Sequence, residues 1–279
     1  MTKAGYDIIE TAKQNGSWTI LDEAEALIIP KDLKMRFKTN LTTLKMTKIN
    51  SWSLATILFI ACSFQPKKKE MEKPKIIYVY DAICGWCFGF SPVMAKLSET
   101  YQDKFDFEVV SGGLKLGKSV GAIDVIAPYI KTAYQDVERT CGVKFGDKFV
   151  NGTLAQGTMI LNSLPPAIAM CIMKERYPDK DIKFAGLLHK MYYVDGIEPE
   201  NYAAYGEYAA LLGFEKSEFN LKMKDSSYIQ KAYKDFEYAQ KLGANSFPTV
   251  ILEKNGKREI LFEGYLPFER AQKLLDSQR

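Results

Sequence analysis

The stretch IIYVYDAICGWCFGFSP, residues 76–92, decides the fold of this chain. It begins with a continuous run of β-branched and aromatic residues, Ile76 to Tyr80, which predicts a strand buried on both faces. From Cys87 onward, apolar or small residues recur at helical spacing, and FDFEVVSGG (105–113) then predicts a second strand. A strand, a helix and a strand in this order predict a parallel strand pair in an α/β fold.

Cys84 and Cys87 lie where the first strand gives way to the helix, and three interpretations of the pair are open. A zinc site needs about four ligands, and the chain offers one histidine, His189, and no second close pair among its five cysteines. A purely structural disulfide would close a loop too short to constrain much chain entropy. The pattern therefore favours a redox couple and predicts no metal.

The position of Cys84 at a helix N-terminus has a chemical consequence. Free amide groups and the helix dipole favour the thiolate, which is the nucleophile in disulfide exchange. Gly85 has no side chain to obstruct a partner, so it and Trp86 are predicted to contact the substrate. Cys87 lies one turn further along and is predicted to resolve a mixed disulfide formed on Cys84. Because the Gly-Trp dipeptide carries no titratable group, the redox direction stays open.

A second segment near the C-terminus predicts the partner of this site. Residues 249–263 predict a β-hairpin whose turn is Asn255-Gly256, and residues 267–278 predict a closing helix. Pro248 stands just before the first hairpin strand, where we expect a cis peptide bond facing the cysteine pair. Phe247 would then offer its backbone to an extended substrate.

DAICGWCFGFSP resembles the active site of the DsbA-like branch of the thioredoxin superfamily, and especially its FrnE-like group. TCGVKFGDKF (140–149) and YYVDGIE (192–198) also resemble that group, so the resemblance covers roughly residues 75–276. It implies a thioredoxin fold with a large helical insertion, and a thiol–disulfide oxidoreductase that acts on cysteine-containing proteins. It also implies a separate redox partner, and no cofactor beyond the dithiol itself.

Helical patterns between the two halves place the boundaries of the insertion. We expect a thioredoxin-like domain made of residues 76–116 and 226–279, with the helical insertion at 117–225. Within the insertion, Cys141 and Cys171 are expected to be buried free thiols rather than a second disulfide. His189 is expected to be a surface or packing residue.

The first 75 residues have a different character. WSLATILFIA (52–61) is too short to span a membrane but suits the apolar part of a signal peptide. LFIAC resembles a bacterial lipobox and predicts lipidation of Cys62, an extracytoplasmic location and a membrane anchor. We expect residues 46–61 to be the signal segment and 62–75 a lysine-rich tether.

Residues 1–45 fit neither the signal segment nor the enzyme. AKQNGSWTILDEAEALIIPKDLK (12–34) resembles a fragment of the YdeI/OmpD-associated family, which suggests a remnant or a wrongly joined reading frame. Translation would then begin at Met46; if Met1 is the true start, a cytoplasmic location is expected.

Composition leaves two other classes of function to weigh. The net charge of +4 comes from interspersed charges and predicts no nucleic-acid surface. A glutathione-dependent isomerase or transferase of the same fold remains an alternative, although such enzymes often carry serine in place of the first cysteine. A non-enzymatic lipoprotein that acts as a binding module or chaperone is the other alternative.

Overall fold

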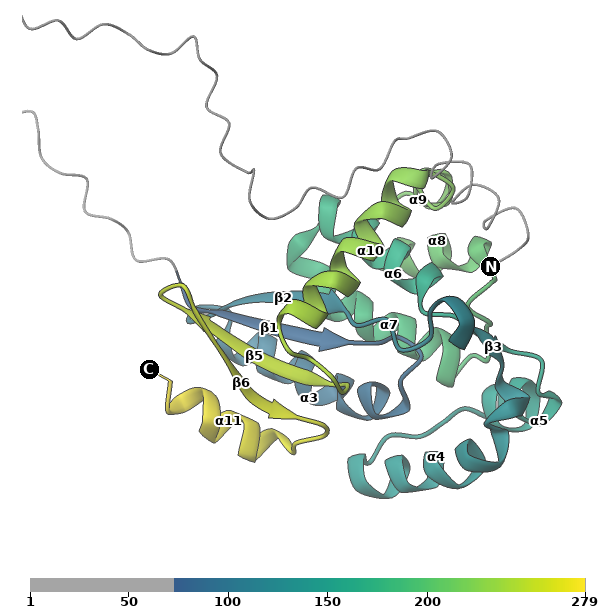
Figure 1. The fold of residues 1–279 in the computed structure, drawn as a ribbon, viewed down its shortest axis with the longest axis horizontal. Coiled ribbons are helices and arrows are strands. Elements are labelled where there is room, and N and C mark those ends of the chain that lie inside the picture. Colours follow the sequence, from purple (N-terminus) through teal and green to yellow (C-terminus); the bar gives the residue numbers. More distant parts are fainter. Residues whose placement is uncertain (1–72, 279) are drawn as a thin grey trace, which may run out of the picture. The chain divides into compact units, whose positions relative to one another are not determined.

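The computed structural model describes residues 73–278 and shows a four-stranded mixed sheet with helices on both faces (Figure 1). The strand order is β2-β1-β5-β6; β1 and β2 are parallel and the other neighbours antiparallel. The predicted α/β thioredoxin fold with a helical insertion is confirmed. The four strands are β1 (Lys75–Tyr80), β2 (Asp106–Ser111), β5 (Thr249–Lys254) and β6 (Lys257–Glu263).

Strand β1 is central and almost fully buried, as its continuous apolar run predicts. Successive side chains of a strand point to opposite faces, so β1 contributes to two separate cores. Ile76, Tyr78 and Tyr80 share one cluster with the inner stripe of helix α3 (Gly85–Tyr101). Ile77 and Val79 share the other cluster with helix α10 (Ser226–Lys241).

The insertion between β2 and β5 is mostly helical, and α4, α5 and β3 lie beyond the end of β1 (Figure 1). Its two short strands, which pair antiparallel, were not expected from the sequence, because two-residue strands leave no periodicity to detect. The remaining elements are β3 (Gly121–Ala122), α4 (Ala127–Cys141), α5 (Leu154–Gln156), β4 (Ile160–Leu161), α6 (Leu164–Arg176), α7 (Asp181–Tyr193), α8 (Tyr202–Ala210), α9 (Lys216–Lys222), α10 (Ser226–Lys241), α11 (Phe268–Asp276), and short helical turns at Gly117–Ser119, Ile123–Val125, Lys148–Thr153 and Pro178–Lys180.

The predicted hairpin and closing helix are present at the C-terminal end. Asn255 and Gly256 both have positive φ, 55° and 73°, which is the conformation that a tight hairpin turn requires. Helix α11 packs against α3, with Ala271 and Leu275 buried. The second half of the sheet is therefore closed by local turn chemistry.

The predicted signal segment, the lipidation site Cys62 and residues 1–45 all lie outside the described residues and stay predictions. Within residues 73–278, none of the helices is both long and apolar enough to cross a membrane.

Candidate active site

Cys84 is the residue that caps the N-terminus of α3. Its backbone is still extended, with φ −95° and ψ 115°, and the helix begins at Gly85. A tight turn produces this change of direction, because the Cys84 amide donates to the Asp81 carbonyl oxygen at 3.1 Å. The Cys84 side chain is 9% exposed, whereas Cys87, one turn later on the inner face, is fully buried.

Asp81 holds the loop that carries the cysteines, although it was not among the site residues expected from the sequence. Its carboxylate accepts the backbone amides of Ile83 at 3.0 Å and Leu114 at 2.7 Å, joining the ends of β1 and β2. Burial raises the pKa of this carboxyl, and these amide hydrogen bonds oppose the rise. The sequence did contain a signal for this role, since Asp81 is an acidic residue placed between a buried strand and the cysteine pair.

The segment of the predicted cis-proline, Phe247-Pro248, lies against Cys84. The Phe247-Pro248 peptide bond is cis, as expected from the sequence. The Cys84 thiol donates to the Phe247 carbonyl oxygen, with Sγ and O 3.6 Å apart, although the two residues are 163 positions apart in the chain. This backbone oxygen is the group that the sequence analysis expected to face a substrate.

The ring of Phe247 fits its place only because Gly112, at the end of β2, has no side chain. A Cβ atom on Gly112 would lie 2.1 Å from the Phe247 ring. The Gly112 amide also donates to the Tyr80 carbonyl oxygen at 2.7 Å, which fixes the glycine to β1. Three separate parts of the chain therefore determine the wall of the site beside Cys84.

The four described cysteines are all free, and their environments differ. Burial, followed by the neighbouring Cys84, raises the pKa of Cys87 well above its usual value. Burial also raises the pKa of Cys141 to about 11 and that of Cys171 to about 12. Cys171 is buried as expected, whereas Cys141, the last residue of α4, is only partly buried. Neither thiol is suited to act as a nucleophile at neutral pH.

His189 is a fully buried part of the site, so the expectation of a surface residue was wrong and that of a packing residue was right. Its Nδ1 lies 2.6 Å from the Ser91 hydroxyl and its Nε2 lies 3.2 Å from the Asp81 carbonyl oxygen. A carbonyl oxygen only accepts, so Nε2 carries the proton and Ser91 donates to Nδ1. Burial lowers the pKa of His189 to about 4, which keeps the ring neutral. The single histidine of the chain thus ties α7 to both ends of the cysteine loop.

A cavity of about 290 Å³ lies beside Cys84, between the start of α3 and the insertion. Gly85 and Trp86, which were predicted to bind substrate, both line it, whereas Phe247 lies on another side of Cys84 and does not. Among the described residues that line the cavity, Lys115 alone carries a charge. The others are Ile83, Cys84, Leu114, Ile123, Ile126, Tyr129, Ile130, Ala133, Tyr134, Val137, Phe145, Phe149, Met159, Leu161, Tyr192 and Tyr193.

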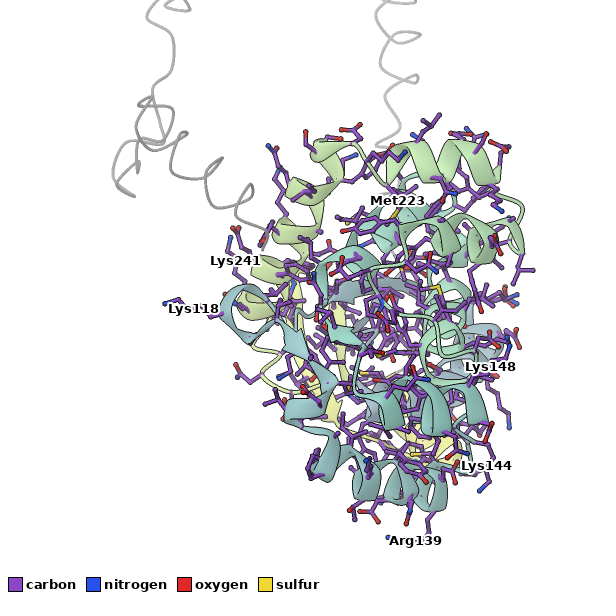
Figure 2. The ribbon with its side chains drawn as sticks, turned by 90° about the vertical axis from the view of Figure 1, so that its right-hand side faces the viewer. Lys118, Arg139, Lys144, Lys148, Met223 and Lys241 are labelled. Carbon is purple, nitrogen blue, oxygen red and sulfur yellow. The ribbon has the colours of Figure 1, made fainter. Side chains whose placement is uncertain are left out.

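The charges of the surrounding surface stay outside this cavity. Figure 2 shows Lys118, Arg139 and Lys144 projecting outward from the edges of the molecule. Arg139 pairs with Asp136, and Lys144 pairs with Glu138. The space next to Cys84 is therefore lined almost entirely by apolar and aromatic side chains.

Comparison with known proteins agrees with this geometry. The model of a family described as the DSBA-like thioredoxin domain matches residues 75–276. The fold is similar to that of a candidate protein disulfide isomerase from Nitrosomonas europaea, with a TM-score of 0.64, 23% identity, and coverage of 74% of this chain and 97% of that one. A search of curated proteins finds no match.

A second protein of similar fold is the cytosolic disulfide reductase DsbM from Pseudomonas aeruginosa. Its TM-score is 0.62 at 22% identity, covering 73% of this chain and 98% of that one. The same protein solved with glutathione gives a TM-score of 0.59 at 23% identity, with the same coverage of both chains.

Proposed function

The chain belongs to the DSBA-like thioredoxin domain family, whose members are thiol–disulfide oxidoreductases or isomerases, and on that premise we propose that Cys84 and Cys87 exchange disulfides with the cysteines of other proteins. One observation carries the proposal: the Cys84 thiol reaches the Phe247 carbonyl oxygen at the cis-proline, while Cys87 lies buried behind it. The sulfur that a partner can reach is therefore also the one next to a backbone group that can bind an extended chain.

The reaction follows from these positions. The Cys84 thiolate attacks a substrate disulfide, or a substrate thiolate attacks the Cys84 sulfur of the oxidised pair, and either route gives a mixed disulfide on Cys84. Cys87, which is shielded from solvent, forms or breaks the internal bond. The two sulfurs are the redox group, so the proposal includes no cofactor. It does include a partner protein that reoxidises or reduces the pair.

The experiment that tests the proposal is equilibration of the protein with glutathione buffers, followed by trapping of free thiols. A reduction potential near that of DsbA, about −120 mV, would mean that the protein donates disulfides. A potential near that of thioredoxin, about −270 mV, would mean a reductase or an isomerase that is fed electrons. If no disulfide between Cys84 and Cys87 forms at any ratio of reduced to oxidised glutathione, the proposal is wrong and the non-enzymatic binding module is favoured instead.

The apolar cavity supports protein substrates that carry a large apolar side chain near the cysteine. Replacing Ala133, which lines the cavity from α4, by phenylalanine would fill part of this space. We expect Ala133→Phe to lower kcat/KM for a reduced, unfolded protein substrate by about 10-fold, which is the effect of losing one buried apolar group of roughly 1.4 kcal/mol. The rate with dithiothreitol, which does not need the cavity, should stay unchanged.

The matched control for this variant is Gln135→Phe, which adds the same ring to an exposed position of α4 outside the cavity. Equal losses in Ala133→Phe and Gln135→Phe would show that the cavity does not select the substrate.

The same cavity bears on the alternative of a glutathione-dependent isomerase or transferase. Glutathione carries two carboxylates and an ammonium group, and the described cavity lining offers one charge, that of Lys115. Burying unpaired charges against apolar walls costs free energy, so the lining favours a protein substrate. Saturation of the exchange rate at low glutathione concentration would support the alternative instead.

We also propose that Cys62 anchors the protein to a membrane outside the cytoplasm. The support is the lysine-flanked apolar run that ends in LFIAC, followed by the polar tether. Metabolic labelling with a fatty acid should mark the wild-type protein and not Cys62→Ala. Peptides from residues 1–45 in the mature protein would contradict the proposal.

A further inference from the structure

Two tyrosine hydroxyl groups lie buried beneath the cysteine pair. Tyr78 and Tyr80 stand on the α3 face of β1, each 1% exposed, with their ring centroids 5.5 Å apart. Within the described part of the chain, neither hydroxyl has a hydrogen-bond partner. A buried hydroxyl without a partner costs free energy, so the presence of two at this place needs an explanation.

Tyr78 is the one of the two that is most closely associated with Cys87. Its ring packs against Phe90, three residues after Cys87 on the same buried stripe of α3, with centroids 5.9 Å apart. Burial raises the pKa of Tyr78 well above its usual value, and the Cys87 thiol is the next largest cause. The ring of Tyr80 packs instead against His189, and the neighbour that most raises its pKa is Asp81, with Cys87 second.

The other polar groups around Cys87 already have partners. Both carboxylate oxygens of Asp81 accept backbone amides, and Ser91 donates to His189. Cys87 itself is fully buried, so bulk water does not reach its sulfur. The Tyr78 hydroxyl is thus a protonated donor on the buried side of the pair, and the Cys87 sulfur is the side-chain group within its reach.

We propose that the Tyr78 hydroxyl donates a hydrogen bond to the Cys87 sulfur when that sulfur becomes negatively charged during disulfide exchange. This inference rests on the proposed function. A substrate thiolate attacks the Cys84 sulfur, a new disulfide bond forms to Cys84, and the Cys84–Cys87 bond breaks. The electron pair of the broken bond goes to the Cys87 sulfur, and the phenol keeps its proton.

The same charged state occurs in the opposite direction. There the Cys87 thiolate attacks Cys84 in the mixed disulfide, and the substrate thiolate leaves. A donor in the apolar interior stabilises this thiolate more than water would, because it is already in place and the surroundings screen little. Tyr78 therefore assists exchange whether the protein acts as an oxidase or as a reductase.

The test is the rate at which dithiothreitol opens the oxidised pair, measured by stopped-flow with the fluorescence of Trp86, which lies between the two cysteines. A hydrogen bond to a charged group predicts that Tyr78→Phe opens about 10- to 100-fold more slowly than wild type. Tyr80→Phe, which also removes a buried hydroxyl without a partner from the same strand face, should open at the wild-type rate.

Two results would overturn the inference. One is a Tyr78→Phe rate equal to that of Tyr80→Phe. The other concerns the alkylation of Cys84 by iodoacetamide in Cys87→Ser, which has no Cys87 sulfur to stabilise. If adding Tyr78→Phe to Cys87→Ser slows this alkylation as much as Tyr78→Phe slows the opening of the oxidised pair, the substitution disturbs the site in general. If wild type itself forms no disulfide, the proposed function fails together with this inference. If wild type opens normally and Tyr78→Phe opens equally fast, only the inference fails.

Discussion

Replacing Cys84 by serine is expected to abolish disulfide exchange with protein substrates, a loss of about three orders of magnitude or more. Serine keeps the size and position of the residue at the start of α3, but a hydroxyl forms no disulfide. The measurement is the rate at which the protein oxidises or reduces an unfolded cysteine-containing substrate, followed by thiol trapping.

Replacing Cys87 by serine is expected to give a different result, which separates the two roles. Cys84 could still attack a substrate disulfide, but no second sulfur would resolve the product, so a mixed disulfide should accumulate and be visible by non-reducing gel electrophoresis. Cys171→Ser is the matched control, because Cys171 is a buried free thiol in α6 that we place outside the site. Exchange that survives Cys84→Ser would contradict the assignment of Cys84 as the attacking sulfur.

The second large effect concerns His189 and acid. Its pKa in the folded protein is about 4, below its usual 6.5, so between these values the unfolded chain binds more protons than the folded one. Stability from this group is full above about pH 6.5 and is lost as the pH falls toward 4. The loss is about 3 kcal/mol, from roughly 1.4 kcal/mol for each unit of pKa difference.

His189→Phe should remove this dependence on pH while keeping an aromatic ring among Tyr80, Phe88 and Tyr193. The variant loses the two hydrogen bonds of His189 at every pH, which lowers its stability by the same amount throughout. The informative quantity is therefore the change in unfolding free energy between two pH values, compared with the same change in wild type. Urea unfolding at pH 7 and at about pH 4 should show that wild type loses about 3 kcal/mol more than His189→Phe. Parallel profiles would contradict the burial of a neutral histidine.

Asp181 provides the control of opposite sign. Burial raises its pKa to about 6 from 3.8, so the folded protein binds more protons in that range and gains stability as the pH falls. The contribution of Asp181 opposes that of His189 over the same pH range, so the two variants should shift the wild-type profile in opposite directions. Asp181→Asn should therefore make the protein lose more stability in acid than wild type does.

The elements next to the cysteine pair could be predicted because their signals are local. The apolar run of β1, the helical stripe of α3 and the Asn255-Gly256 turn each follow from the spacing and backbone preferences of neighbouring residues. The cis peptide at Pro248 could also be predicted from the sequence, because only proline tolerates a cis peptide at low cost and a hairpin follows directly.

What only the tertiary structure decided is which distant side chains share the space around Cys84 and Cys87. Asp81, His189 and Gly112 are single residues in unrelated segments, and no periodicity marks them as neighbours. The apolar cavity likewise depends on where α4 packs, and Tyr78 looks in sequence like any buried strand residue. By itself the sequence determined the position of the cysteine pair between its strand and its helix, since chain neighbours are held together by covalent bonds. The environment that sets the charge and reach of the two sulfurs arises from long-range packing, in which each contact depends on all the others.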